Sequence, residues 1–173
     1  MRKFITGSMF VLGVASLPVS LSTGQARPTP TPDYRKDPRF ETLRKFFHQG
    51  ECPAEHYSAA FLEAADVYGL DWRLLPSLAF IESTGGKAAR YNNLFGWDEG
   101  RARFATAVAG IHAVGYSLSH LEIYRNKRLD GLLATYNPNA DYGMRVKSVM
   151  RRIAAVRWGL GGGKSTCCVS TVD

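Results

Sequence analysis

The sequence predicts a mainly α-helical domain that carries a small β-hairpin lobe. Apolar residues recur at the three- and four-residue spacing of an amphipathic helix in five segments of the chain. A segment between the third and fourth of these is instead rich in strand-forming residues around an Asp-Glu-Gly turn. The length of 173 residues fits about one ordinary domain, and the hydrophobic content of 45% is typical of a chain with a packed core.

Both ends of the chain differ in composition from its middle. Arg2 and Lys3 precede an uncharged, largely apolar stretch, and Gly24, Gln25 and Ala26 then place small residues around a larger one. This layout is typical of a secretory signal peptide cleaved after Ala26, whereas the shortness of the apolar core and its Pro, Ser and Thr residues disfavour a membrane span. We therefore expect a signal peptide (1–26), a Pro/Thr-rich linker (27–39), one folded domain (40–158) and a flexible Gly-rich tail (159–173).

The helical segments have recognisable beginnings and ends. Gly69 is a natural stop for the second helix, and Asp71 stands in an N-cap-like position before the third. Pro76 falls within about the first turn of that third helix, where a missing N–H costs least. The five expected helices cover about 37–49, 53–69, 70–83, 106–124 and 142–158.

Residues 92–104 are the exception to the helical pattern. Leu94, Phe95 and Trp97 are strand formers, an Asp-Glu-Gly turn follows them, and Phe104 continues after the turn. A short two-stranded hairpin is the expected form of this segment.

The net charge is moderately positive. The formal value is +7, and removal of Arg2 and Lys3 with the signal peptide leaves 20 basic and 15 acidic residues. Such a protein could be attracted to an anionic cell-wall polymer, a membrane surface or nucleic acid, although ordinary solubility charge explains the balance equally well. Because no dense Lys/Arg block with interleaved aromatic residues is present, we expect no nucleic-acid partner.

Three cysteines bear on the redox state of the protein. Export makes a disulfide between Cys52 and either Cys167 or Cys168 feasible, but free thiols in a loose tail fit the sequence equally well. The histidines are scattered and no Cys/His spacing resembles a metal site, so we expect neither a metal nor a cofactor.

A carboxylate lies on the apolar side of the third helix. Leu75, Leu78 and Glu82 are separated by three and four residues, so they share one face. Desolvation beside the leucines and the negative pole of the helix C-terminus should both raise the pKa of Glu82. Gly85 and Gly86 locate that terminus and should leave space in front of the acid. A carboxyl that stays protonated near neutral pH is what a general acid requires.

A purely structural role for Glu82 is the alternative. The acid could pair with Arg73, Lys87 or Arg90 and cap the end of the helix, since structural ion pairs also perturb pKa values. The neighbouring sequence favours chemistry, because aromatic and amide side chains suit the apolar faces and hydroxyl edges of a sugar ring. The side chains expected to bind substrate are Ser83, Tyr91, Asn92, Asn93, Trp97, Asn137 and Tyr142, together with Tyr136. Trp97 fits a place in the core equally well.

Glycosidases generally use two carboxylates, and their separation decides the stereochemistry. Asp98 and Glu99 follow Glu82 by about one short lobe and are the candidates for the second carboxylate. Asp-Glu-Gly is also ordinary turn chemistry, so a solvated turn explains these residues as well.

The combination of these segments resembles a known superfamily. The helix-borne "AFIESTGGKAARYNNLFGW", a following Phe and then "YNP", a Tyr and a Val look like the lysozyme-like superfamily of peptidoglycan-cleaving enzymes. The resemblance is strongest to bacterial glucosaminidases (mannosyl-glycoprotein endo-beta-N-acetylglucosaminidase-like) and to soluble lytic transglycosylases. It spans about Cys52 to Ile153 and implies a lysozyme-like helical domain with a small β-hairpin lobe.

The resemblance also implies roles for single residues. The catalytic acid of the family falls on Glu82, and Ser83 follows it as Ser often does in transglycosylases. The "YN" position falls on Tyr136 and Asn137, with the Tyr136 hydroxyl approaching the acid and orienting either it or the substrate. Two departures, Tyr-Asn-Pro-Asn in place of Tyr-Asn-Ala-Gly and "NNLFGW" in place of Gly-Leu-Met-Gln, favour the glucosaminidase-like branch.

Together these observations predict a secreted or periplasmic glycoside hydrolase that acts as a monomer on peptidoglycan or a related N-acetylhexosamine polymer. No stable membrane insertion is expected once the signal peptide is cleaved. Two alternatives stay open: a lytic transglycosylase that leaves 1,6-anhydro ends, and a lysozyme-like wall-binding module without turnover.

Overall fold

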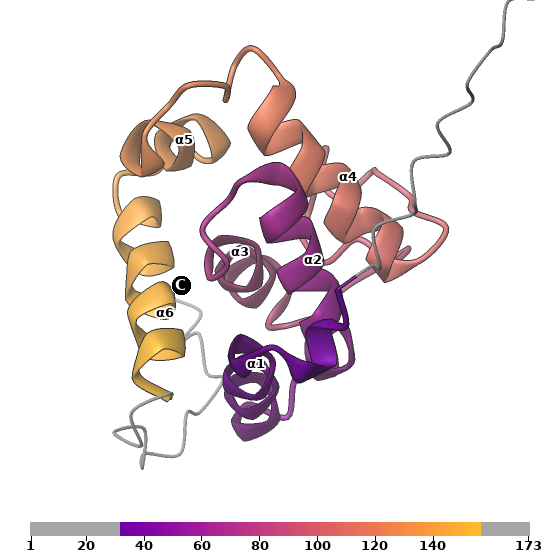
Figure 1. Cartoon of the computed structure of the whole chain (residues 1–173). Helices are drawn as coiled ribbons and strands as arrows, with labels where there is room; N and C mark the ends of the chain where they lie inside the picture. Colours follow the sequence, from indigo (N-terminus) through magenta and orange to yellow (C-terminus); the bar gives the residue numbers. More distant parts are fainter. Residues whose placement is uncertain (1–31, 157–173) are drawn as a thin grey trace, which may run out of the picture. The chain divides into compact units, whose positions relative to one another are not determined.

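The computed structural model of the chain describes residues 32–156, and these residues form six α-helices, whose arrangement is drawn in Figure 1. The expectation of a mainly α-helical domain is confirmed. Two short 3-10 helices, η1 and η2, complete the regular structure of the described residues. In chain order the elements are η1 (Tyr34–Lys36), α1 (Pro38–Gln49), η2 (Pro53–Tyr57), α2 (Ser58–Tyr68), α3 (Leu74–Ser83), α4 (Ala107–His120), α5 (Leu129–Tyr136) and α6 (Tyr142–Val156).

Helix α3 is the inner helix of the arrangement. Both views of the ribbon place it between α2 and α6, and it packs against each of them. Most of its residues are apolar and buried, and Leu75 and Leu78 are fully enclosed. A helix that is apolar on nearly all sides is stable only inside a core. The core therefore fixes the position of the C-terminal end of α3, which carries Glu82.

Aromatic rings connect α3 to its surroundings. Phe47 of α1 stacks on Phe61 of α2 with ring centroids 5.7 Å apart, and Phe61 meets Phe95 edge-on at 6.5 Å. All three rings are 1% exposed or less. The segment after α3 is therefore attached to the same core as α1 and α2 through Phe95.

Helix α5 was not predicted. It has eight residues, of which Leu132 and Leu133 are buried, and Gly131 lies within it. So short a segment shows too few repeats of the helical period to be recognised. Its packing against α6 stabilises it, and the turn between the two helices brings Tyr136 and Tyr142 together.

Regular structure begins within the segment that was expected to be a linker. The Asp37 side chain accepts a hydrogen bond from the Arg39 backbone N–H at 2.7 Å and so caps α1. Arg39 also reaches Asp66 of α2 at 2.7 Å, and Tyr34 packs on the core. The expected signal peptide (1–26) and Gly-rich tail (159–173) lie outside the described residues.

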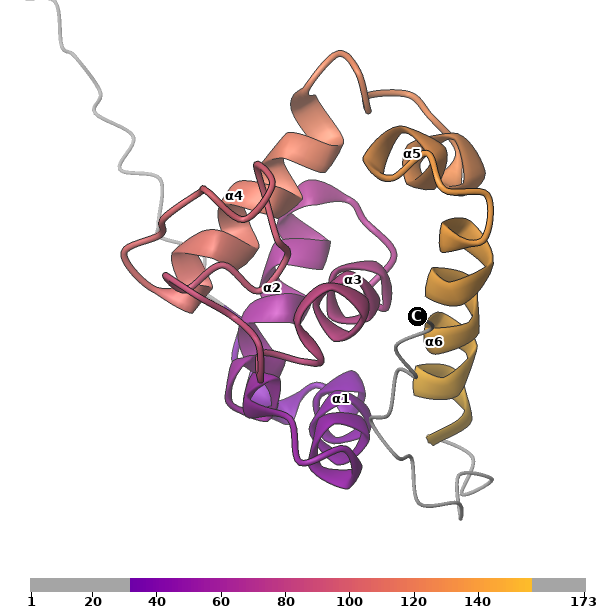
Figure 2. The ribbon, with the colours of Figure 1, turned by 180° about the vertical axis from the view of Figure 1, so that it is seen from behind.

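The prediction of a β-hairpin lobe at residues 92–104 was wrong, because the described residues contain no strand. The segment is a series of turns with one isolated bridge between Arg90 and Asn93. Figure 2 shows it as an irregular loop beside α3 and α4. Positive φ angles at Asp98 (54°) and Glu99 (52°) interrupt the extended conformation that a strand needs. Turns, rather than a β-ladder, therefore place the strand-forming side chains of this segment against the core.

Candidate functional site

The end of α3 is fixed by a buried hydroxyl. Ser83 Oγ donates to the carbonyl oxygens of Ala79 and Leu94, at 3.0 and 2.7 Å, and accepts from the Gly86 N–H at 3.0 Å. Ser83 is 3% exposed. It therefore ties the helix end to the following turns, and the substrate contact expected for it stays a prediction.

The glycines after Glu82 do not open space in front of it, contrary to expectation. A Cβ at Gly85 would lie 2.6 Å from Cys52 Cβ, and one at Gly86 would lie 3.1 Å from a Leu94 methyl carbon. Both glycines therefore serve close packing. Gly96 is the glycine that faces the acid, since a Cβ there would stand 3.5 Å from Glu82 Oε2. Gly96, fourteen positions after Glu82, therefore leaves the space in front of the acid.

Glu82 lies in the wall of a hollow of about 750 Å³. Trp97 forms an aromatic wall with Tyr124 and Tyr136, with ring centroids 6.3 and 5.9 Å away. Volume and lining are those of a small-molecule site, in which apolar surface is combined with a few polar groups. The full lining is Glu82, Phe95, Gly96, Trp97, Asp98, Glu99, Ala102, Tyr124, Tyr136 and Asn137.

Burial raises the pKa of the Glu82 carboxyl. Two groups oppose this effect without cancelling it: the Tyr142 hydroxyl donates to Oε1 at 2.6 Å, and the positive charge of Arg145 also favours the ionised form. The alternative in which Arg73 caps this helix end is not seen, because Arg73 pairs with Asp71 at 2.6 Å. The environment of Glu82 therefore favours retention of its proton.

Two tyrosines exchange the roles that the sequence suggested. Tyr142 is the residue that hydrogen-bonds Glu82, whereas the Tyr136 hydroxyl donates to the Phe95 carbonyl oxygen at 2.9 Å. Their rings stack, with centroids 5.8 Å apart and 12° between the planes. Tyr136 nevertheless lines the hollow beside Asn137. Tyr136 is thus a wall of the site, and Tyr142 is the group that positions the acid.

Residues 91–93 stabilise the loop that follows α3 and are not part of the lining of the large hollow. Asn93 is 4% exposed; its amide donates to the Trp97 carbonyl oxygen at 3.0 Å and its Oδ1 accepts from the Trp97 N–H at 2.9 Å. Asn92 donates to the carbonyl oxygens of Phe104 and Ala105. Tyr91 is half-exposed beneath the Arg103 guanidinium, 3.6 Å from its ring centroid. The two Asn93 hydrogen bonds hold the Trp97 backbone in place, whereas the Asn92 and Tyr91 contacts tie the start of the loop to its end.

Both candidates for the second carboxylate lie at the large hollow with Glu82. Asp98 and Glu99 are exposed and pair with Arg101 at 2.9 and 3.3 Å. The hydrogen bond from Arg101 lowers the pKa of Asp98, so that this carboxyl remains ionised. Glu82 and Asp98 therefore have pKa values displaced in opposite directions, a property of acid and base pairs in active sites.

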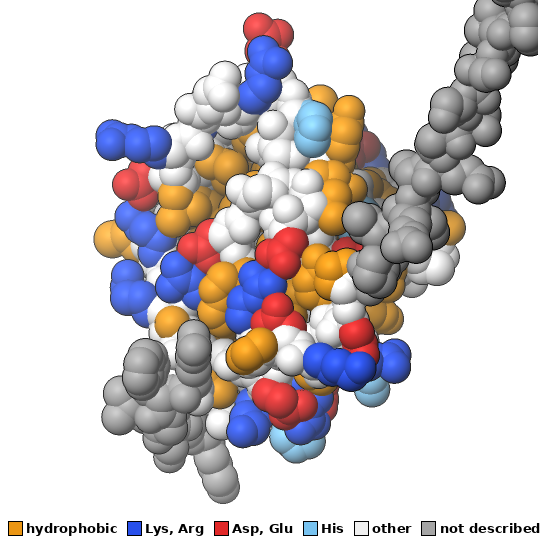
Figure 3. Space-filling view, viewed as in Figure 1, with side chains coloured by type: hydrophobic (Ala, Val, Ile, Leu, Met, Phe, Trp, Pro, Cys, Tyr) orange, Lys and Arg blue, Asp and Glu red, His pale blue; other side chains and the backbone are white. Residues whose placement is uncertain are grey.

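Charge is unevenly distributed along the described chain. Between residues 121 and 156 there are seven Lys or Arg residues against three Asp or Glu, whereas residues 32–120 have ten against eleven. Figure 3 shows Lys and Arg side chains along the edge formed by α5 and α6. This edge begins beside the hollow, where Arg145 follows Tyr142 by one helical turn.

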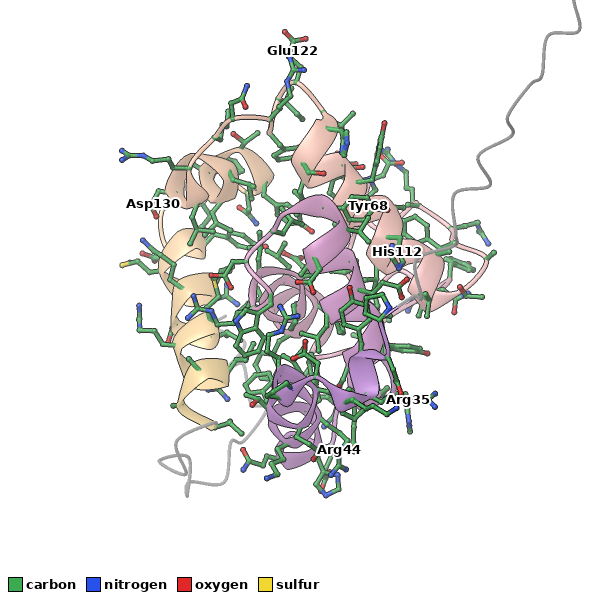
Figure 4. The ribbon with its side chains drawn as sticks, viewed as in Figure 1. Arg35, Arg44, Tyr68, His112, Glu122 and Asp130 are labelled. Carbon is green, nitrogen blue, oxygen red and sulfur yellow. The ribbon has the colours of Figure 1, made fainter. Side chains whose placement is uncertain are left out.

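The histidines stand away from this site. His112 of α4 meets Tyr68 of α2, with 3.4 Å between Nδ1 and the hydroxyl, and Figure 4 shows the pair at the contact of the two helices. The His120 ring also contacts Tyr68 edge-on. Among residues 32–156, no group of three or more His, Cys, Asp or Glu side chains could hold a metal ion.

Two further expectations concern the membrane and the cysteines. Within the described part of the chain, no helix has the length and apolar character that a membrane crossing requires. Cys52 is buried, but Cys167 and Cys168 lie outside the described residues, so the cysteine pairing stays a prediction.

Comparison of the chain with protein-family profiles, with curated proteins and with solved structures gave no significant match.

Proposed function

We propose that the chain is a glycosidase that cleaves the N-acetylhexosamine backbone of peptidoglycan, with Glu82 as the general acid. One observation supports this most strongly: a partly buried carboxyl with a raised pKa lies in the wall of a hollow lined by aromatic rings. A raised pKa lets a carboxylic acid deliver a proton near neutral pH, and aromatic rings suit the apolar faces of sugars.

In this mechanism Glu82 donates its proton to the glycosidic oxygen as the bond to the anomeric carbon breaks, and water then adds to that carbon and gives up one proton to a carboxylate of the site. Tyr142 holds the carboxyl by its hydrogen bond to Oε1, and Gly96 leaves Oε2 accessible from the hollow. Asp98 is the better candidate for the ionised partner, because its lowered pKa keeps it negative while positive charge develops on the sugar. With the signal-like segment at residues 1–26, this activity would be exercised outside the cytoplasm.

The test is the Glu82→Gln variant, which preserves shape and the acceptor for Tyr142 but has no proton to give. We expect turnover of purified cell wall to fall by at least about 10²-fold, the usual contribution of a general acid, with an unchanged circular dichroism spectrum. Glu122→Gln is the matched control, because Figure 4 shows Glu122 on the loop after α4, pointing outward. Full lytic activity of Glu82→Gln would refute the proposal.

Mass spectrometry of the wall digest separates the related functions. New reducing ends would support hydrolysis, whereas 1,6-anhydro ends would assign the same acid to a lytic transglycosylase. Binding of chitooligosaccharides by the unaltered protein without any cleavage would leave a wall-binding module.

A further inference from the structure

A second, smaller hollow adjoins the candidate acid. Its volume is about 120 Å³, and Glu82 and Gly96 belong to the lining of both hollows. A chain-like ligand that passes over Glu82 would therefore extend from one hollow into the other. The lining of the smaller hollow is Glu82, Ser83, Ala88, Arg90, Asn93, Gly96 and Gly100.

The two hollows differ in charge. The large one is lined by Asp98 and Glu99 as well as Glu82, whereas the smaller one is lined by Arg90 and the same acid. Arg90 is exposed, and no carboxylate of the described residues forms an ion pair with it. Asp98 and Glu99 are each paired with Arg101, whereas Arg90 has no such partner among the described residues. A negatively charged group of a ligand would therefore be attracted to the Arg90 side of Glu82 rather than to the other side.

The backbone that carries Arg90 is held in one conformation. The Asn93 N–H donates to the Arg90 carbonyl oxygen at 2.9 Å, and the same two residues form the isolated bridge. Asn93 is itself buried and bonded to Trp97. The guanidinium therefore extends from a fixed point beside the hollow, and such a donor suits bidentate recognition of a carboxylate.

We infer that the hollow lined by Arg90 binds a carboxylate substituent of the polymer, so that the acid-bearing sugar occupies this side of Glu82 and an uncharged sugar occupies the aromatic side. This inference rests on the proposed function for the identity of the polymer. The carboxylate can come from the sugar itself or from a peptide attached to it, and both sources present the same chemistry to Arg90.

The test measures binding and turnover separately. Calorimetry with the inactive Glu82→Gln protein uses three probes: chitotetraose, a peptide-free tetrasaccharide of alternating N-acetylglucosamine and N-acetylmuramic acid, and its peptide-bearing counterpart. Arg90→Gln in this background should weaken binding of an acid-bearing probe about tenfold and leave chitotetraose within about twofold. The peptide-free probe carries the carboxylate on the sugar and the peptide-bearing probe carries it on the peptide, so the arm that responds identifies the source.

Two further variants separate a specific contact from general electrostatics. Arg90→Lys should recover part of the lost affinity. Lys87→Gln removes an exposed cation three residues earlier, outside the lining of both hollows, and should have no effect. In the active protein Arg90→Gln should raise KM for the acid-bearing strand with little change in kcat. Its pH profile should stay in place, because among the described residues Arg145 is the cation that acts on the Glu82 pKa.

The inference is overturned if Arg90→Gln weakens all three probes equally, if it weakens none, or if the acid-bearing probes do not bind. These outcomes differ from failure of the proposed function, which is absence of cleavage by the unaltered protein. Calorimetry still decides the role of Arg90 in that case.

Discussion

Tyr142→Phe removes the hydroxyl that donates to Glu82 Oε1 at 2.6 Å while keeping the ring that stacks on Tyr136. A hydrogen bond to a charged group contributes about 1.5–3 kcal/mol, whereas a neutral one contributes about 0.5–1.5 kcal/mol. The variant should therefore lose about 1.5–3 kcal/mol of unfolding free energy where Glu82 is ionised. It should lose only about 0.5–1.5 kcal/mol where Glu82 is protonated.

The direction of this pH dependence follows from the linkage between protonation of Glu82 and folding. The Tyr142 hydrogen bond lowers the pKa of Glu82, so the bond stabilises the ionised form more than the protonated one. Its removal raises that pKa further. The loss of stability must then grow as the pH rises through the Glu82 pKa, and the alkaline limb of the activity profile must move to higher pH.

Urea denaturation followed by tryptophan fluorescence, between about pH 4 and pH 8, measures this dependence around the reference range of a Glu carboxyl. Tyr136→Phe is the matched control, because its hydroxyl donates to the backbone carbonyl of Phe95, which does not titrate in this range. The control should lose about 0.5–1.5 kcal/mol at every pH. Equal losses for Tyr142→Phe at both ends of the range would refute the assignment of Tyr142 as the partner of ionised Glu82.

Three further outcomes follow from the same structure. Burial raises the Glu82 pKa in the folded protein, so folding takes up a proton between the unfolded and folded pKa values, and the stability of the protein falls as pH rises through that window. Glu82→Gln should therefore have a higher melting temperature than the unaltered protein at neutral pH and no such gain below about pH 4. Differential scanning calorimetry at both pH values measures this difference. Arg145→Gln removes a charge that lowers the Glu82 pKa, so the alkaline limb of the kcat–pH profile should move to higher pH in low salt. This shift should shrink in about 1 M salt, because salt screens the charge. Gly85→Ala combines a φ of +61° with a Cβ 2.6 Å from that of Cys52, and a loss of about 2–5 kcal/mol in urea denaturation is expected; a loss below about 1 kcal/mol would contradict that close packing.

The position of Glu82 was predictable because a local pattern determines it. The apolar residues of α3 repeat at helical spacing, and the helix ends where Thr84 adopts a left-handed conformation with φ at 53°. Both facts depend on neighbouring residues, so the acid on the apolar face followed from the sequence. Desolvation was expected to raise its pKa, and burial is the largest cause of that shift in the structure.

The partners of Glu82 were harder to predict because they come from distant segments. Tyr136 and Tyr142 are only six residues apart, and the choice between them depends on the turn that follows the unpredicted helix α5. The hairpin prediction failed for a related reason. Strand-forming side chains in residues 92–104 are buried here by turns, and a single bridge forms between Arg90 and Asn93.

The loop that replaces the hairpin gives the site its shape at a cost in backbone strain. Tyr91, Asp98 and Glu99 all have φ between 52° and 54°, and each such non-glycine residue costs on the order of 1–3 kcal/mol. The network of Asn93 offsets part of this cost, because a buried amide with several backbone partners fixes a single conformation. This loop places Gly96 against the acid and Asp98 at the large hollow simultaneously. The strained turns are therefore the feature that brings an acid from α3, an aromatic wall and two hollows of different charge to one place.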